Sequence, residues 1–252
     1  MEPLNSTRSF EWWAAYVAAS SFAHFVLFRL FPGSPRERSL FASTIHAINC
    51  VVAVLAWNCV YSPDFWNPTR MFLGVIGTGD ELMPYLILYS FGYFMYDFIV
   101  MIAYPETADW QSFVHHFTVA SSMVGGTYLN VAVPYMFFFL IEELSTPFLN
   151  LKYFARNRPV AYHWFSVTFA LTFLFSRMVC GSAIYLTLAY HAREGLALMP
   201  GTVEASAFCF MFACVTVTRA LNLNWSRLIL GKLFAMGKAK KVAATAVPDK
   251  ME

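Results

Sequence analysis

The stretch PYLILYSFGYFMYDFIVMIAY, residues 84–104, decides the fold class of the chain. It is apolar along almost its whole length, and its single charged side chain is that of Asp97. About 20 mainly apolar residues in a helix are enough to cross the hydrocarbon core of a bilayer. The stretch therefore predicts a membrane-spanning helix that carries a carboxylate inside it.

The composition of the whole chain agrees with a membrane protein. Of the 252 residues, 58% are hydrophobic and 13% are charged, whereas a soluble domain carries about 25% charged residues. The net charge of +2 is too small to suggest nucleic-acid binding. The five cysteines lie in apolar stretches without a CxxC motif, which is typical of small core residues rather than of a disulfide framework or a metal site.

Seven stretches are long and apolar enough to cross a bilayer. They are residues 11–31, 40–61, 84–104, 111–129, 131–151, 162–190 and 203–230. The fourth stretch is the weakest because it contains two histidines, and only Asn130 and Pro134 separate it from the fifth. We predict an all-α membrane protein with about seven transmembrane helices, and an arrangement of six is the alternative.

Lysine and arginine residues are divided unequally between the two sides of a seven-span arrangement. One side holds Arg8, Arg70 and Arg193. The other side holds Arg29, Arg36, Arg38, Lys152, Arg156, Arg158, Arg227, Lys232, Lys238, Lys240, Lys241 and Lys250. Basic residues accumulate on cytosolic loops, so we expect a lumenal or external N-terminus and a cytosolic C-terminus. Residues 1–34 would form a lumenal tail and the first helix, and residues 231–252 a basic, disordered cytosolic tail.

Ionisable side chains from three predicted helices lie at similar depths in the membrane. At about 1.5 Å per residue, Asp97 lies roughly 10 Å from the cytosolic end of its helix, and His115 and His116 lie roughly 6–8 Å deep. Glu142 and Glu143 lie roughly 12–14 Å deep by the same count. An unpaired charge in hydrocarbon costs about 2.5–3.5 kcal/mol. We therefore expect these five side chains to meet inside the protein as a candidate catalytic group.

This layer of ionisable side chains has two possible roles, a catalytic one and a structural one. A neutral imidazole in a water-poor pocket is a good base or nucleophile, and a nearby carboxylate can orient it. The alternative is a set of buried ion pairs that hold helices together, above all for Arg177 and Arg219. Adjacent histidines on a helix diverge by about 100°, so we expect neither a metal site nor a bound cofactor.

The residues around the two glutamates indicate a cavity beside them. On an α-helix, Glu142, Ser145 and Thr146 share one face, and Glu143 points about 100° away. Pro147 has no N–H and frees the carbonyl of Glu143. A free carbonyl at membrane depth needs a polar partner or a water-filled cavity.

Three motifs resemble the TLC-domain family, which includes the ceramide synthases. They are GYFMYD at 92–97, DWQSFVHH at 109–116 and EELSTPFLN at 142–150. The similarity spans about residues 35–230. The resemblance implies residence in the endoplasmic reticulum or plasma membrane and a barrel of six helices around a lipid-sized cavity. It also implies a cavity lining that includes Tyr93, Ser112, Asn130, Ser145, Thr146 and Arg177.

The resemblance to ceramide synthases is partial at the reactive residues. His115 and His116 match the paired histidines that are taken to serve acyl transfer from acyl-CoA to a sphingoid base, and Asn130 matches the family's asparagine. The second His-Asp pair of those enzymes falls on Glu142-Glu143. A later family aspartate falls on Thr146, and Val133 replaces an arginine.

Two functions follow from this comparison. The first is a role in lipid homeostasis, in which the cavity binds an acyl chain and influences membrane phospholipid composition. The alternative is an acyl-CoA-dependent acyltransferase of the ceramide-synthase type, with acyl-CoA as a substrate. Membrane lipids or fatty acyl chains are the expected partners, and a homodimer is an alternative to a monomer.

Overall fold

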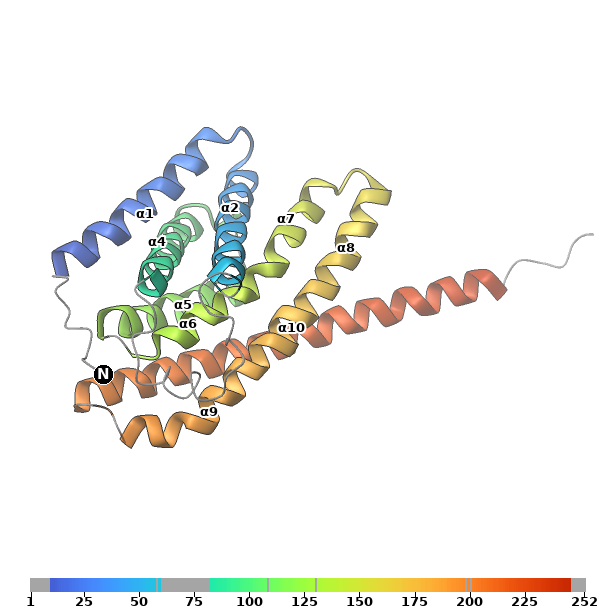
Figure 1. Ribbon diagram of the computed structural model, residues 1–252. Helices are drawn as coiled ribbons and strands as arrows, with labels where there is room; N and C mark the ends of the chain where they lie inside the picture. The colour runs from blue at the N-terminus through green and yellow to red at the C-terminus, as the bar shows by residue number, and fades with distance from the viewer. Residues whose placement is uncertain are drawn as a thin grey trace, which may run out of the picture.

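The computed structural model describes residues 10–57, 59, 82–107, 109–129, 131–197, 199 and 201–245, with side chains up to Phe234. Within these residues every regular element is a helix (Figure 1). Five helical stretches are long and apolar enough to span a membrane: Phe10–Leu30, Pro35–Ala56, Leu82–Ala103, Pro159–Ala197 and Thr202–Phe234. The chain is an all-α membrane protein, as its sequence predicts.

The first three spans are regular α-helices. They are α1 (Phe10–Leu30), α2 (Pro35–Ala56) and α4 (Leu82–Ala103). The start of α2 lies five residues before the predicted one because a capping box fixes it. The Ser34 hydroxyl accepts a hydrogen bond from the backbone N–H of Glu37, whose carboxylate accepts one from the backbone N–H of Ser34. Such a box satisfies two backbone donors at a helix start.

The fourth and fifth predicted spans form α5 (Trp110–Leu129) and a broken helix. The broken helix consists of α6 (Val133–Phe139), the 3₁₀ segment η3 (Leu140–Ser145) and α7 (Thr146–Phe154). Neither is among the five stretches that qualify by length and hydropathy. Both are nevertheless helical, from Trp110 to Leu129 and from Val133 to Phe154. The choice between six and seven spans therefore depends on the broken helix.

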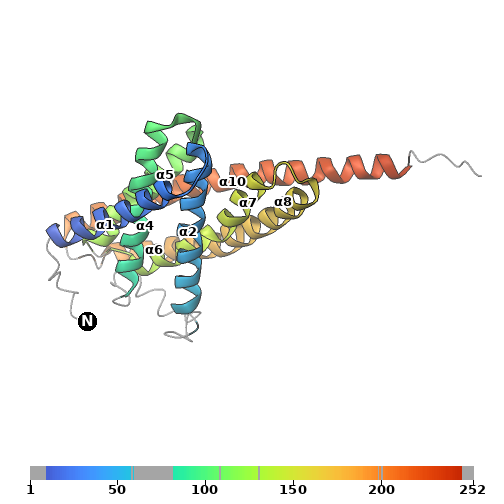
Figure 2. The same ribbon diagram turned by 90° about the horizontal axis from the view of Figure 1, so that it is seen from above.

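The last two spans are longer than a bilayer requires. One is a continuous run of α8 (Pro159–Phe173), the π-helical segment η4 (Leu174–Cys180) and α9 (Gly181–Ala197). The other is α10 (Thr202–Thr245), which projects well beyond the rest of the bundle (Figures 1 and 2). The sequence predicts a disordered tail from residue 231, whereas α10 extends to Thr245. Residues 231–245 are rich in alanine and lysine, which have high helix propensity, so the helix continues.

Six helical segments close into a ring. In order around it, α2 contacts α4, α4 contacts α5, α5 contacts α10, and α10 contacts η4. The run of α8 and η4 contacts the segment of η3 and α7, which returns to α2. Helix α1 packs against the outside of α4 and α2, as Figure 1 also shows. This ring is the six-helix arrangement that the sequence resemblance implies.

Three connections meet at one end of the ring, which we call the basic end. It is formed by residues 31–34, 104–107 with 109, and 155–158. A guanidinium nitrogen of Arg36 donates to the carbonyl of Glu106 over 3.3 Å, and Arg156 lies 3.2 Å from the carboxylate of Glu37. At the opposite end, the indole of Trp13 donates to the Thr127 hydroxyl over 3.1 Å. Successive spans therefore alternate in direction.

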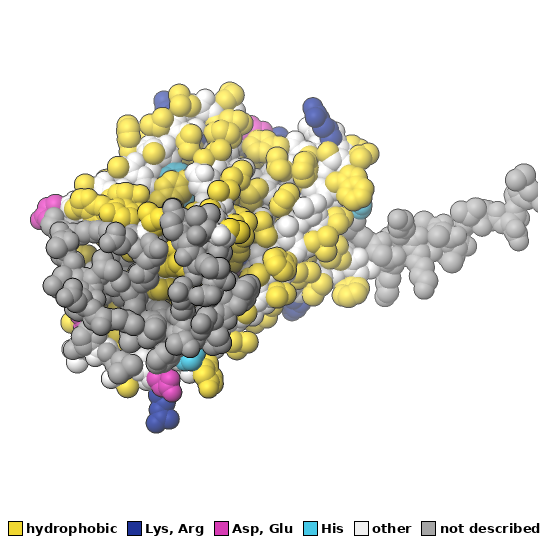
Figure 3. All heavy atoms as spheres, in the orientation of Figure 1, with side chains coloured by type: hydrophobic (Ala, Val, Ile, Leu, Met, Phe, Trp, Pro, Cys, Tyr) yellow, Lys and Arg dark blue, Asp and Glu magenta, His cyan; other side chains and the backbone are white. Residues whose placement is uncertain are grey.

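The surface of the ring is mostly apolar. Figure 3 shows hydrophobic side chains over most of the described face, with few charged groups. Phe22, Ile99 and Leu186 are 67%, 62% and 64% exposed. Side chains of this kind face acyl chains when a helix crosses a bilayer, which is consistent with the predicted spans.

Candidate functional site

A cavity of about 660 Å³ lies inside the ring and is lined by all six of its segments. Its walls at the basic end include the exposed side chains of Asp109, His163 and Lys232, so the cavity opens there. Its inner wall carries the ionisable groups of the predicted polar layer. Ligand pockets in proteins usually measure about 300–1,000 Å³, so the cavity is large enough for a small molecule or an acyl chain.

The structure brings most of the predicted site residues to this one cavity. Its lining includes Asp97, His115, His116, Glu143, Tyr93, Ser112, Ser145, Thr146 and Arg177. Glu142 lies behind this wall, and Asn130 lies outside the described residues. The catalytic roles of these side chains stay predictions.

His116 and Asp97 form a close pair on the cavity wall. The Nδ1 atom of His116 lies 3.0 Å from Oδ2 of Asp97, at ion-pair distance but without hydrogen-bond alignment. The other carboxylate oxygen accepts a hydrogen bond of 3.2 Å from the Ser39 hydroxyl. Asp97 is 3% exposed and His116 is 16% exposed. The carboxylate is thus fixed from α2, and the imidazole beside it reaches the cavity.

His115 points toward a different neighbour. Its ring lies edge-on to the indole of Trp225 on α10, with centroids 5.5 Å apart. The side chain is buried, and its Nδ1 atom has no hydrogen-bond partner among the described residues. The rings of His115 and His116 are 5.7 Å apart at an angle of 67°, so they diverge as adjacent helical residues should. No three described His, Cys, Asp or Glu side chains come together in a way that could hold a metal ion.

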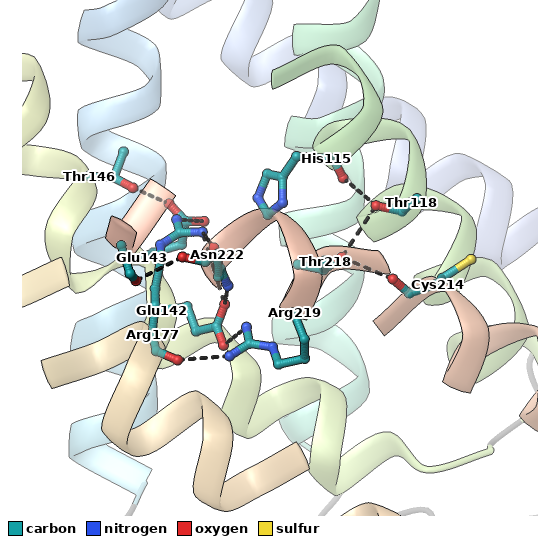
Figure 4. A network of polar contacts seen from close by, with 11 residues as sticks. His115, Thr118, Glu142, Glu143, Thr146, Arg177, Cys214, Thr218, Arg219 and Asn222 are labelled. Atoms are coloured by element: carbon teal, nitrogen blue, oxygen red, sulfur yellow. Dashed lines mark hydrogen bonds and ion pairs between the residues drawn. The ribbon is translucent and has the colours of Figure 1, made fainter. Parts of the chain in front are cut away.

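Glu142 belongs to a closed network of ion pairs and hydrogen bonds (Figure 4). Its carboxylate pairs with Arg219 of α10 and accepts a hydrogen bond of 3.1 Å from the amide of Asn222. Arg177 donates to the Asn222 side-chain oxygen over 3.2 Å, and Arg219 donates to the Arg177 carbonyl over 2.8 Å. Gly181 makes this approach possible, because a side chain there would collide with the Glu142 carboxylate. Glu142 therefore joins η3 to η4 and α10.

Glu143 has a different environment, although it is the next residue. It accepts a hydrogen bond of 2.7 Å from Thr146, and Arg177 lies 3.8 Å from its other oxygen. The predicted grouping of Glu142 with Thr146 is wrong, because residues 140–145 form a 3₁₀ helix. Three residues per turn place residues i and i+3 over one another. Thr146 is consequently the partner of Glu143.

Arg177 reaches the site from η4, which is a π-helix rather than an α-helix. Ser176 and Arg177 are both buried in this segment. Single π-helical turns are rare and often lie at functional sites. The sequence identifies Arg177 as an intramembrane charge but gives no sign of the π-helical turn.

Two buried histidines behind the cavity wall were missed by the sequence interpretation. His46 of α2 stacks on the ring of Tyr93, with centroids 3.8 Å apart, and its Nε2 atom lies 2.9 Å from the Ser90 hydroxyl. His24 of α1 lies 3.2 Å from the hydroxyl of Tyr89. Both lie inside predicted apolar spans, which is the same signal that identified His115 and His116. They support Tyr93, which lines the cavity.

Comparisons with known proteins identify the family. The chain matches the TLC domain over residues 38–231, and it belongs to the TLC-domain family. The resemblance seen in the three motifs is thereby confirmed.

Individual relatives are distant but cover much of the chain. TLC domain-containing protein 4 A of Dictyostelium discoideum is 23% identical over 75% of this chain and 75% of its own. TLC domain-containing protein 4 C of the same organism is 28% identical over 62% of this chain and 57% of its own. Topoisomerase I damage affected protein 4 of Saccharomyces cerevisiae is 24% identical over 94% of this chain and 84% of its own. No solved structure is significantly similar to the chain.

Proposed function

We propose that this protein binds the acyl chain of a membrane lipid inside the ring and acts in lipid homeostasis by influencing phospholipid composition. The observation that carries the proposal is the cavity of about 660 Å³, which opens at the basic end and has ionisable groups on its inner wall. A lipid has an apolar chain that such a cavity shields and a polar group that its walls can recognise.

The mouth of the cavity suits an anionic group. Lys152, Lys232 and His163 line it, beside a single carboxylate, that of Asp109. The Lys152 ammonium lies 5.6 Å from the ring of Tyr162 and 5.7 Å from that of Phe169, at cation–π distance. Such contacts stabilise a cation by about 0.5–1 kcal/mol at exposed sites. The ammonium is thereby held at the entrance, where a phosphate would pass.

The basic end also supports an orientation in the membrane. Because Lys and Arg accumulate on cytosolic loops, we infer that the mouth faces the cytosol and that the N-terminus is lumenal or external. A cytosolic mouth is open to a water-soluble acyl-CoA, and the family resemblance implies residence in the endoplasmic reticulum or the plasma membrane.

A second candidate function is acyl transfer from acyl-CoA, and the contact between His116 and Asp97 favours it. In such a reaction, a hydroxyl or amine of the acceptor attacks the thioester carbonyl, and His116 removes the acceptor's proton. The bond between carbon and sulfur then breaks, and the CoA thiolate leaves and receives that proton. Asp97 would stabilise the imidazolium in between. The neighbouring His115 is the alternative base or acyl acceptor.

One experiment separates the two functions. Wild type and the variants His115→Ala and His116→Ala are purified in detergent, their bound lipids are extracted for mass spectrometry, and transfer from acyl-CoA is assayed. His191→Ala is the matched control, because His191 lies on α9 outside the cavity lining. Bound lipid without turnover supports the binding function. Turnover that is lost in the cavity variants and kept in the control supports the enzyme, and the absence of both lipid and turnover overturns both.

A further inference from the structure

A second cavity of about 60 Å³, which we call the inner pocket, lies beyond the polar layer. Four side chains line both cavities and form what we call the neck: Phe94, His115, Glu143 and Arg177. The remaining wall of the inner pocket combines six apolar side chains with the hydroxyls of Ser122 and Thr218 and the ion pair of Glu142 and Arg219. The apolar members are Val119, Met123, Met136, Phe139, Leu140 and Val215. The inner pocket has about the volume of two water molecules in the liquid.

The large cavity, the neck and the inner pocket follow one another along the helices. On α5, Ser112 lines the large cavity, His115 lies at the neck and Met123 lines the inner pocket. On α10, Lys232 lines the large cavity and Val215 lines the inner pocket. At 1.5 Å per residue, these two residues of α10 are about 25 Å apart along the helix. The distance from mouth to inner pocket is therefore comparable with the thickness of a hydrocarbon layer, about 30 Å.

The neck can admit an apolar chain without leaving an ion unpaired. Arg177 and Glu143 lie 3.8 Å from one another, so the two charged members of the neck compensate each other. Phe94 and His115 supply ring surfaces to the neck. Beyond the neck, the apolar side chains of the wall favour a hydrocarbon end over water, and the charged pair of Glu142 and Arg219 in that wall compensates itself.

We propose that the inner pocket receives the methyl end of the bound acyl chain and that Met136 sets the longest chain that fits. This inference rests on the proposed lipid-binding function. Met136 sets this limit because its flexible side chain, which fills irregular gaps, lines the inner pocket and ends in the space left open by Gly126.

Gly126 of α5 determines where the Met136 side chain can lie. A side chain at residue 126 would overlap the end of the Met136 side chain. The glycine thus lets Met136 rest against α5, and any larger residue pushes Met136 toward the inner pocket that it lines. The size of the inner pocket depends on this pair of residues.

The test measures the chain lengths of the lipids that copurify with the full-length protein. Wild type, Met136→Ala and Met136→Phe are purified from the same cells, and bound lipids are identified by mass spectrometry. Met211→Ala is the matched control, because Met211 is 1% exposed on α10 and lines neither cavity. Burial of each additional methylene corresponds to about a fourfold gain in affinity. Met136→Ala should therefore raise the ratio of longer to shorter chains about fourfold for each added methylene, and Met136→Phe should lower it.

The outcomes distinguish the inference from the function beneath it. Lipid bound to wild type with the same chain lengths in both Met136 variants overturns the inference and leaves lipid binding intact. An equal shift in Met211→Ala also overturns it, because general loosening of the core would then be the cause. Wild type without bound lipid overturns the proposed function itself. Gly126→Ala is a second route, and it should shorten the bound chains as Met136→Phe does.

Discussion

Two groups of ionisable side chains lie close together in the ring and differ in how completely their polar atoms are paired. Glu142 is enclosed by Arg219 and Asn222, and its carboxylate is fully occupied. His116 and Asp97 form a single contact, and His116 remains partly exposed to the cavity. The difference shows that charge at membrane depth does not by itself identify a reactive site. A closed network holds helices together, whereas an open pair is available to a ligand.

The largest expected effect comes from opening the closed network. Arg219→Ala leaves Glu142 buried without its main partner, which should lower the free energy of unfolding by about 3–5 kcal/mol. Chemical unfolding in detergent, followed by circular dichroism, measures this loss. The double variant Glu142→Leu with Arg219→Met removes both charges and should recover most of the stability. If the double variant is as unstable as Arg219→Ala, the network has a role beyond charge compensation.

A smaller effect on stability and a large one on chemistry should follow from changing the open pair. If the protein transfers acyl groups, His116→Ala should reduce turnover by a factor of about 100 or more, since it removes a general base. Its unfolding midpoint should stay close to that of wild type, because the side chain lies on the cavity wall. Loss of turnover together with loss of folding would show that the pair is structural, like the closed network.

The ionic contact within the open pair offers a finer test. Asp97→Asn keeps the shape of the side chain and the hydrogen bond from Ser39 but removes the charge beside His116. We expect turnover or lipid binding to fall by less than in His116→Ala, with a loss of stability of about 1 kcal/mol. The two readouts come from the same assay and the same unfolding experiment. An effect larger than that of His116→Ala would make Asp97 the principal group of the pair.

The smallest expected effect is at the mouth. Lys152→Ala removes an ammonium that contacts Tyr162 and Phe169, at a cost of about 0.5–1 kcal/mol. Binding of an anionic amphiphile should weaken severalfold at low salt and much less at high salt, because salt screens exposed charges. Lys152→Gln serves as the control for side-chain length. A loss of affinity that does not depend on salt would contradict an electrostatic role.

Much of the fold could be predicted from the lengths of the apolar stretches in the sequence. In the described parts of the chain, the seven predicted stretches are helical apart from a few end residues such as Tyr104 and Val131. Breaks inside the helices were not predictable, because η3 and η4 depend on packing between helices rather than on local sequence. The extension of α10 was missed because its lysines suggested a solvated tail.

The site was predictable in content and less so in pairing. Counting residues from the cytosolic ends of the predicted helices places Asp97, His116 and Glu143 at similar depths. All three side chains line the cavity. The sequence could not predict the pairing of Glu142 with Arg219. The 3₁₀ geometry of η3 determines which glutamate faces the cavity and which faces Arg219. The positions of His24 and His46 were not predictable for a similar reason. They depend on which face of each helix is buried, which the apolar sequence does not show.

The lipid site inside the ring is tested most directly by a variant that fills the cavity, with bound lipid as the measurement. Ser112 lines the large cavity, so Ser112→Trp should displace an acyl chain. Leu186→Trp is the control, because Leu186 is 64% exposed on the outside of α9. Native mass spectrometry should find lipid on wild type and on Leu186→Trp, and little or none on Ser112→Trp. Equal amounts of lipid on all three proteins would contradict a lipid site inside the ring.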